Sequence, residues 1–496
     1  MKTYKLLRNV SFLFLSKGIY VISLFIIFAI VVRSFSRADA NLYALALAFN
    51  NFFIFMADFG TVDLVIRGSS IAKKDDLFAI FLSGLLAKLV YSLGASLIIY
   101  FAIRIMYDDA LTRYAIFIFC FNAVICSYSE YIDGIATGIG RTEIISVFNF
   151  FQYAALLGMY WWFSVIAPRP IISLMWWHTA VVAIFLLIRI LWVRKLCEWR
   201  YKKEYFIKCL KGMFRENPAF GVSSIIDYIT GTHLYVIAIS LFQGVKNDLA
   251  VFQGAFKIFG LTYLLGAIIS RSLYAATSLS FINKDKEELT FHIKRAFHLM
   301  GLLYLFAFVV FFFLGDKVIN LFYTKHLPGA ETILYYLALT LPVGFYGYIA
   351  DALLPAANLQ KVKTYINLAM FIIAIPIVYL FTRNFGIIGT AISWIIISLG
   401  KIGCLLAIQY LYFQMIPDYK ALWKVFASMT VVGLAFWLLR GALPLIPLLL
   451  GGACLYGLLL LILKEDEAIF PHLRREVYNL VSLKYKTKET RSLHGK

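Results

Sequence analysis

Apolar runs of about 20 residues recur along the whole sequence, and this repetition restricts the possible folds more than any other feature. Each run is long enough to cross the ~30 Å hydrocarbon core of a bilayer as a helix. In lipid, only helices and closed barrels satisfy all their backbone hydrogen bonds. Barrel strands alternate apolar and polar residues, whereas runs such as YVISLFIIFAIVV (20–32) do not. The sequence therefore predicts an all-α integral membrane protein.

The composition agrees with this prediction. The chain is 62% hydrophobic and 15% charged, whereas soluble proteins have about 25% charged residues. The first apolar stretch, 10–32, exceeds the 7–15 residue core of a signal peptide, so we expect it to remain as the first span. The six cysteines show no C-x-x-C spacing, and we expect free thiols.

We predict about fourteen spans in two pseudo-symmetric six-helix lobes, followed by two extra helices. The repeat is indicated by YIDGIATGIG (131–140) and YIADALLPAA (348–357), each followed by a short basic loop. Parallel repeats of this kind occur in transporters. The predicted spans are 10–32, 41–66, 77–103, 114–135, 144–166, 171–193, 218–241, 249–275, 296–314, 331–357, 364–381, 386–412, 421–439 and 443–463. The predicted domains are an N-lobe (1–193), a basic linker (194–217), a C-lobe (218–413), the extra helices (414–464) and a basic tail (465–496).

The loop charges predict the orientation in the membrane. With the N-terminus inside, inner segments carry roughly three times as many Lys and Arg as outer loops, as the positive-inside rule requires. Both termini are then cytoplasmic. The net charge of +20 becomes a feature of the inner surface, which indicates anionic lipids as partners and needs no nucleic acid. Residues 204–216 read as an amphipathic helix lying on that surface.

Twelve charged residues fall inside the predicted spans, where each costs roughly 2.5–3.5 kcal/mol unless it is paired or hydrated. Most lie in the inner half, which favours a water-filled vestibule open to the cytoplasm. The basic residues are Lys17, Lys88, Arg189, Lys257, Arg271 and Lys401. The acidic residues are Asp58, Asp63, Glu130, Asp133, Asp227 and Asp351.

The segment ADFGTVDLVIRG (57–68), at the end of the second span, contains two of these charges, Asp58 and Asp63, followed by Arg67. Asp63 and Arg67 are four residues apart, which suits an ion pair on one helix face. Asp58 has no basic residue one turn away, so we interpret it as a lone carboxylate that faces the cavity. We therefore expect Asp58→Asn to lower transport and Asp63→Asn mainly to lower the amount of protein.

The remaining buried charges suggest binding roles. Glu130 and Asp133 are three residues apart and could bind a cation or share a proton, or could line a hydrated helix end. Lys17 and Arg271 lie at similar depth in opposite halves and could hold phosphate, or could extend to the inner surface. The candidate substrate-binding residues are Lys17, Arg271, Lys88, Lys257 and Lys401. The candidate coupling or cavity acids are Asp58, Glu130, Asp133, Asp227 and Asp351, and no metal site is predicted.

The sequence contains no Walker A pattern and no segment long enough for a soluble catalytic domain. We therefore predict that the protein is not an enzyme and needs no cofactor.

The chain resembles the polysaccharide-unit flippases (O-antigen, Wzx-type) of the multidrug/oligosaccharidyl-lipid/polysaccharide (MOP) exporter superfamily. The resemblance rests on the fourteen spans, on ADFGTVDLVIRG and on DGIATGIGRTE (133–143). It implies that a polyprenyl-pyrophosphate-linked oligosaccharide moves by alternating access from the inner to the outer leaflet of the cytoplasmic (inner) membrane. It also implies a cationic cavity, to which Lys17 and Arg271 correspond by position. Other membrane proteins of polysaccharide assembly are further expected partners.

Two other functions remain open. The first is a cation-coupled multidrug exporter of the same superfamily. Those exporters use an acidic residue in span one, where this chain has Lys17 and no acid. The second is a membrane-embedded glycosyltransferase or polymerase, which the short outer loops and the missing soluble domain disfavour. A cationic cavity would indicate a pyrophosphate cargo, and an anionic cavity would indicate a cationic drug.

Overall fold

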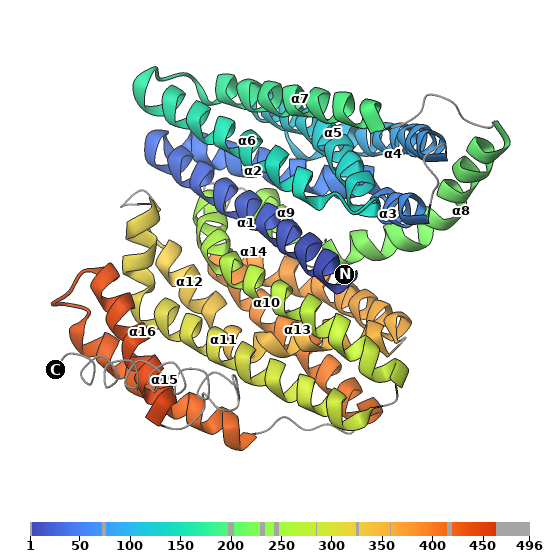
Figure 1. Cartoon of the computed structure of the whole chain (residues 1–496). Helices are drawn as coiled ribbons and strands as arrows, with labels where there is room; N and C mark the ends of the chain where they lie inside the picture. Colours follow the sequence, from blue (N-terminus) through green and yellow to red (C-terminus); the bar gives the residue numbers. More distant parts are fainter. Residues whose placement is uncertain are drawn as a thin grey trace, which may run out of the picture. The chain divides into compact units, whose positions relative to one another are not determined.

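A computed structural model describes residues 2–71, 76–196, 203–228, 234–242, 248–283, 285–323, 327–357, 359–413 and 419–462. Within these ranges the chain consists of helices and short turns, without strands, so the predicted all-α fold is confirmed (Figure 1). The elements are α1 (Lys2–Ser34), α2 (Arg37–Asp58), α3 (Thr61–Ile71), α4 (Leu77–Met106), α5 (Ala110–Gly138), α6 (Thr142–Trp161), the π-helical turn η2 (Trp162–Ile166), α7 (Ile171–Leu196), α8 (Lys203–Tyr228), α9 (Leu234–Leu241), α10 (Leu249–Asn283), α11 (Lys286–Tyr323), α12 (Ala330–Ala338), α13 (Leu341–Ala356), α14 (Gln360–Phe413), α15 (Tyr419–Leu439) and α16 (Leu445–Ile462).

The described helices are those of a multi-pass membrane protein. In the described ranges, eight helices are long and apolar enough to cross a bilayer. The pair α12 and α13, bent by 56°, would add a ninth, and three shorter apolar helices occur as well. Helix α14 contains both predicted spans 364–381 and 386–412, with a kink at Gly386 (φ 62°, ψ −142°). The helix count is thus consistent with about fourteen spans.

The predicted second span is broken, so the single helix expected over 41–66 is wrong. Helix α2 ends at Asp58, and Phe59 (φ 42°) and Gly60 (φ 82°) both adopt left-handed backbone conformations before α3 begins. Glycine adopts this conformation without steric cost. The polar residues of ADFGTVD therefore lie at the junction of two helices instead of within one.

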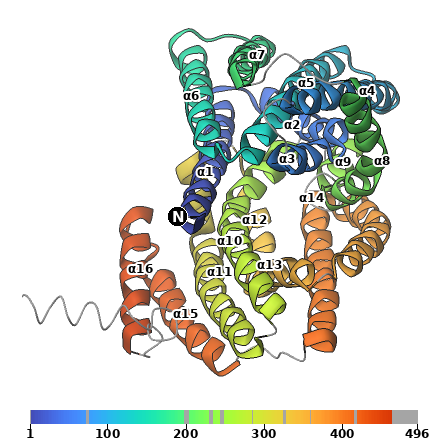
Figure 2. The ribbon, with the colours of Figure 1, turned by 45° about the vertical axis from the view of Figure 1, so that its right-hand side comes forward.

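Helix α8 differs from the prediction in two ways. It runs without a break through residue 217, where the sequence suggested the end of a linker. Its apolar face was expected to meet lipid, but Met213 packs with Leu64 and Ala87, and the Phe214 ring lies 5.7 Å from Tyr91. Helix α8 therefore packs against α3 and α4 (Figure 2). Its basic side chains Lys208, Lys211 and Arg215 are exposed.

The described chain divides into two compact units whose segments alternate along the sequence. Unit 1 comprises 1–261, 322–333 and 364–397, and unit 2 comprises 262–321, 334–363 and 398–496. In unit 1, α1 packs along α6, and α5 packs against α2, α3 and α7. In unit 2, α15 packs against α16, and the Tyr456 hydroxyl donates to the Leu302 carbonyl (3.4 Å). The predicted lobes 1–193 and 218–413 and their pseudo-symmetry stay predictions.

The five cysteines within the described ranges are free thiols, as predicted (Cys120, Cys126, Cys209, Cys404 and Cys454). Cys197 and the basic tail from 465 onward lie outside the described residues.

Candidate functional site

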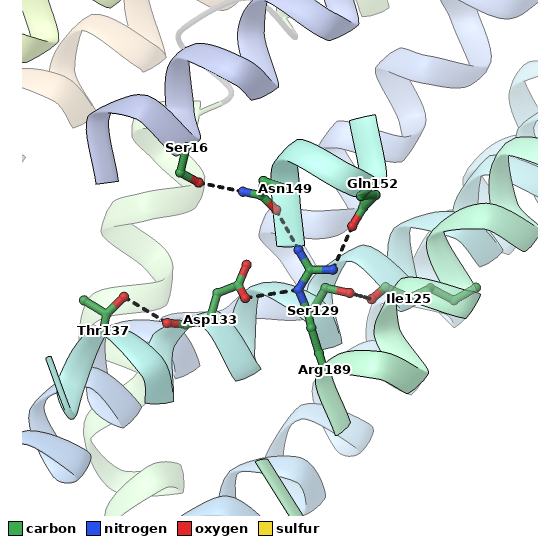
Figure 3. A network of polar contacts seen from close by, with 8 residues as sticks. All are labelled: Ser16, Ile125, Ser129, Asp133, Thr137, Asn149, Gln152 and Arg189. Carbon is green, nitrogen blue, oxygen red and sulfur yellow. Dashed lines mark hydrogen bonds and ion pairs between the residues drawn. The ribbon is translucent and has the colours of Figure 1, made fainter. Parts of the chain in front are cut away.

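A buried arginine is the centre of the largest polar network in Figure 3. Arg189 on α7 is 1% exposed. Its Nε donates to Asp133 Oδ1 of α5 (3.1 Å), and its Nη1 and Nη2 donate to Gln152 Oε1 (2.7 Å) and Asn149 Oδ1 (2.6 Å) of α6. One guanidinium thus connects three helices of unit 1. Since arginine stays protonated in proteins, the network holds a permanent positive charge next to a carboxylate.

The network continues to a fourth helix, α1. Asn149 Nδ2 donates to Ser16 Oγ at 2.6 Å (Figure 3). A guanidinium has only donors, so the Asn149 oxygen has to face Arg189 and its nitrogen has to face Ser16. Ser16 directly precedes Lys17, the first candidate substrate-binding residue.

A second ion pair lies at the break between α2 and α3. Lys88 Nζ of α4 is 2.9 Å from Asp58 Oδ1 and 3.0 Å from Thr61 Oγ1. Asp58 Oδ1 also accepts from the Thr61 hydroxyl (2.7 Å) and from the backbone N–H of Val62 (3.2 Å). The Lys88 side chain is fully buried, whereas Asp58 is 21% exposed. The interpretation of Asp58 as a lone carboxylate is therefore wrong, because its partner comes from another helix.

Glu130 and Asp133 lie in different surroundings, and a cation or proton shared between them stays a prediction. Asp133 binds Arg189, whereas the Glu130 side chain is exposed. Among the described residues, Glu130 has no hydrogen bond or ion pair. We refer to Lys17, Asp58, Lys88, Glu130 and Asp133, the charged side chains carried by α1, α2, α4 and α5 of unit 1, as its charged layer.

The other candidates have different surroundings. Lys17 on α1 is exposed, and Lys401 on α14 is half-buried. Lys257 on α10 is half-buried, with its Nζ 5.1 Å from the centre of the Phe28 ring in a cation–π contact. Arg67 is exposed. Its pairing with Asp63 stays a prediction, and the binding of phosphate by Lys17 and Arg271 stays one as well. The side chains that lie outside the described part are those of Asp63, Asp227, Arg271 and Asp351.

From the sequence, no binding or structural role was assigned to Arg189, and neither Asn149 nor Gln152 was singled out. A signal existed in FLLIRILWV (185–193), where Arg189 has no acidic residue three or four positions away. A charge in such an apolar helix requires a partner on another helix.

A set of contacts at one end of unit 1, here named the α1–α2 clasp, joins residues more than 200 positions apart. The ion pair Arg37–Asp248 (2.5 Å) is its exposed part. Inside it, the N–H of Ala250 donates to Asn41 Oδ1 (2.7 Å), and Gln253 Nε2 donates to the Ala44 carbonyl (2.9 Å). Arg33 Nε also donates to the Phe322 carbonyl (2.7 Å). The clasp thus consists of Arg33, Arg37, Asn41 and Ala44 on one side and of Asp248, Ala250, Gln253 and Phe322 on the other.

Aromatic rings fill the space beside the clasp. Phe25 and Phe28 of α1 make edge contacts with Phe322 (4.7 Å) and Tyr323 (6.0 Å), respectively. The Tyr323 hydroxyl donates to the carbonyl of Gly254 on α10 (3.1 Å). The clasp and these rings would have to separate before α1 and α2 could move away from α10.

The ion pair at the helix break leads to a prediction about stability. We expect Asp58→Leu to destabilise the protein by about 3 kcal/mol, because it leaves a fully buried ammonium without its carboxylate. The amount of folded protein in membranes and its melting temperature in detergent measure this effect. Replacing the partner as well, in Asp58→Leu/Lys88→Met, should recover most of the loss. Normal levels and melting of the single variant would contradict the structural role of the pair.

A model of the polysaccharide biosynthesis protein family matches residues 6–274, which is more than half of the chain. The chain belongs to this family. A second family model, MatE, matches residues 222–380. The predicted resemblance to the MOP superfamily is thereby confirmed for this member of the polysaccharide biosynthesis family. A sequence comparison with curated proteins gives no significant match.

Solved structures of other proteins share their fold with most of this chain. The chain is similar to the lipid II flippase MurJ in an inward closed conformation, with a TM-score of 0.73 and 16% identity, over 92% of this chain and 99% of MurJ. The chain is also similar to a MOP superfamily transporter from Pyrococcus furiosus, with a TM-score of 0.60 and 14% identity, over 83% of this chain and 95% of the transporter. Its similarity to an inward-facing multidrug resistance MATE transporter has a TM-score of 0.58 and 16% identity, over 80% of this chain and 94% of that transporter. The shared fold is thus that of transporters and flippases, and it includes nearly the whole chain.

Proposed function

We propose that the protein is a flippase that moves polyprenyl-pyrophosphate-linked oligosaccharide from the inner to the outer leaflet of the cytoplasmic membrane, for O-antigen or related surface polysaccharide. The observation that carries the proposal is the combination of the polysaccharide biosynthesis family with a fold similar to that of a lipid II flippase over 92% of the chain. A sugar–pyrophosphate head cannot cross hydrocarbon without a polar path, whereas a polyprenyl tail can remain in lipid. A membrane protein with charged side chains at membrane depth supplies such a path.

The charge of α1 supports an anionic cargo. The twelve charged residues at membrane depth are six basic and six acidic, so their sum does not distinguish the two cargoes. Two of the acids, Asp58 and Asp133, form ion pairs with Lys88 and Arg189. Helix α1 contributes Lys17 and no acid. A pyrophosphate would be attracted by this positive charge, and a cationic drug would be repelled.

The α1–α2 clasp supports alternating access as the mechanism. In the proposed orientation, with cytoplasmic termini, the clasp joins the outer ends of α1, α2 and α10. It then closes the outer side while the charged layer receives cargo from the cytoplasm. Exposed Lys208, Lys211 and Arg215 of α8 would lie on the cytoplasmic side, where they suit anionic lipid headgroups.

The experiment that tests the function is rescue of surface glycan in a strain that lacks its own flippase, using several defined lipid-linked units. We expect wild-type protein to restore glycan and Lys17→Ala to reduce it at least tenfold at an unchanged protein level, because charge-assisted bonds to phosphate are strong. Lys195→Ala, an exposed residue of α7, is the control and should retain export. Full export by Lys17→Ala would show that Lys17 does not bind the cargo. If the wild-type protein restored surface glycan with none of the units, the proposed flippase function would be refuted.

A multidrug exporter is the second candidate. It is favoured by the MatE match over residues 222–380 and by the fold shared with MATE transporters. Drug accumulation measured in the same strain separates the two functions, because a flippase should leave accumulation of cationic dyes unchanged. Dye export that depends on Glu130 would favour the exporter.

A further inference from the structure

The Asn149 side chain of α6 contacts both α7 and α1, and its amide group can take only one orientation. Its oxygen accepts from Arg189 Nη2 and its nitrogen donates to Ser16 Oγ, both at 2.6 Å. Turning the amide would bring its NH2 group against a guanidinium that has no acceptor, and the hydrogen bond to Arg189 would be lost. The positive charge of Arg189 therefore fixes the direction in which Asn149 presents its donor to α1.

The bond to Ser16 also fixes how α1 is rotated about its axis. Ser16 is 4% exposed and faces α6. Lys17 is the next residue, about 100° further round the helix, and it is exposed. One turn later Tyr20 meets Tyr153 of α6 edge to face at 5.6 Å. The contacts of Ser16 and Tyr20 with α6 therefore set the direction in which Lys17 leaves α1.

A second hydrogen bond joins α1 and α6 one turn away, but it is not part of this network. The hydroxyl of Ser146 donates to the Phe12 carbonyl (2.5 Å). This bond does not involve Arg189 or Asn149, and Phe12 lies five residues before Lys17 in α1. Ser146 and Asn149 thus offer two bonds across the same pair of helices, only one of which is tied to the buried arginine.

We infer that Arg189 is a positioning residue for the transport site: through Asn149 and Ser16 it sets the orientation of Lys17 towards the charged layer. The inference rests on the proposed function only for the role of Lys17. The geometric part, that the chain from Arg189 to Ser16 orients residue 17, is independent of the cargo.

The geometric part is tested by thiol labelling at position 17. Lys17→Cys is placed in a protein whose native cysteines are replaced, and its reaction rate with a charged methanethiosulfonate is measured with and without Ser16→Ala. We expect Ser16→Ala to change the rate at least fivefold, because the rotation of α1 is released. Ser146→Ala, the matched control at the same interface, should change it less than twofold. Equal effects of both variants, or none from Ser16→Ala, would overturn the inference.

The functional part is tested by transport kinetics of reconstituted protein with Lys17 intact. Ser16→Ala should raise the apparent KM for lipid-linked oligosaccharide about three- to tenfold, the equivalent of one hydrogen bond, with little change in maximal rate. Asn149→Asp should remain close to wild type, because the carboxylate still accepts from Arg189 and the Ser16 hydroxyl can turn to donate to it. Asn149→Leu should show the Ser16→Ala defect or a larger one. Failure of the Asn149→Asp rescue would refute the positioning role.

These two tests separate the inference from the proposed function. If Lys17→Ala exports normally while labelling at position 17 still responds to Ser16→Ala, the proposed role of Lys17 fails and the geometric inference holds. If Lys17→Ala abolishes export while Ser16→Ala changes neither labelling nor KM, the inference fails and the proposed function remains.

Discussion

Replacing Asp133 by leucine is expected to cause the largest loss of stability of any single change in the described helices. Arg189 would remain 1% exposed with its carboxylate partner removed, and breaking a buried pair in this way costs about 3–5 kcal/mol. Unlike a lysine, an arginine cannot escape this cost by losing its proton. At about 2–4 °C per kcal/mol, the melting temperature in detergent should fall by roughly 10 °C.

Three further variants test whether the loss of stability comes from the buried charge of Arg189. Asp133→Asn keeps an acceptor for Arg189 Nε and should lose less stability than Asp133→Leu. Asp133→Leu/Arg189→Met removes both charges and should be more stable than Asp133→Leu alone, since paired replacement of buried charges is well tolerated. Lys195→Met, on the exposed face of the same helix, should melt like wild type. A single variant no less stable than the double variant would mean that the buried charge is compensated elsewhere.

Locking the α1–α2 clasp is expected to stop transport. Asn41 and Ala250 are joined by a 2.7 Å hydrogen bond from the Ala250 N–H to Asn41 Oδ1, so we choose these two positions for a disulfide, which needs Cα atoms about 4.4–6.8 Å apart. After oxidation, Asn41→Cys/Ala250→Cys should lose at least 90% of its export, about tenfold, because α2 can no longer leave α10. Export of surface glycan before and after oxidation, and again after reduction, measures this effect.

The controls for the locked clasp use neighbouring positions. Asp39→Cys/Ala250→Cys should not cross-link, because Asp39 lies about 200° round α2 from Asn41 and bonds to Ser36. Each single cysteine should export normally after oxidation. Reduction should restore export to the locked protein. Normal export by the fully cross-linked pair would show that the clasp stays closed throughout the cycle, and alternating access at this end would be excluded.

The apolar runs were sufficient to predict the helices but not where they break. The expected span 171–193 agrees closely with α7 (Ile171–Leu196), because its ends are set by composition alone. The break at Phe59–Gly60 was missed because hydropathy continues across it, and a left-handed backbone gives no hydropathy signal. The sequence predicted the face of α8 correctly as apolar but could not predict that α3 and α4 would cover it.

The charged residues were predicted better than their partners. Spacing along one helix gave Asp63 with Arg67 and Glu130 with Asp133, since residues three or four apart are neighbours on a helix. The ion pairs that these charges form, Asp58–Lys88 and Asp133–Arg189, join positions 30 and 56 apart on different helices. Such pairs depend on how helices pack, which periodicity within one helix does not encode. The excess of charges at depth was a sound signal that partners must exist.

The break in the second span also has a mechanical consequence. Two rigid rods, α2 and α3, meet at two residues, and the Asp58 carboxylate holds this joint to the start of α3 and to Lys88 of α4. A rotation of α2 relative to α3 would therefore take place at Phe59–Gly60. Because α2 and α3 both pack on α5, such a rotation would have to shift the contacts of α2 with α5 while the Asp58 carboxylate keeps the two helix ends together. The joint lies beside the Asp58–Lys88 ion pair, so opening the clasp end of α2 and rearranging that pair would be one movement.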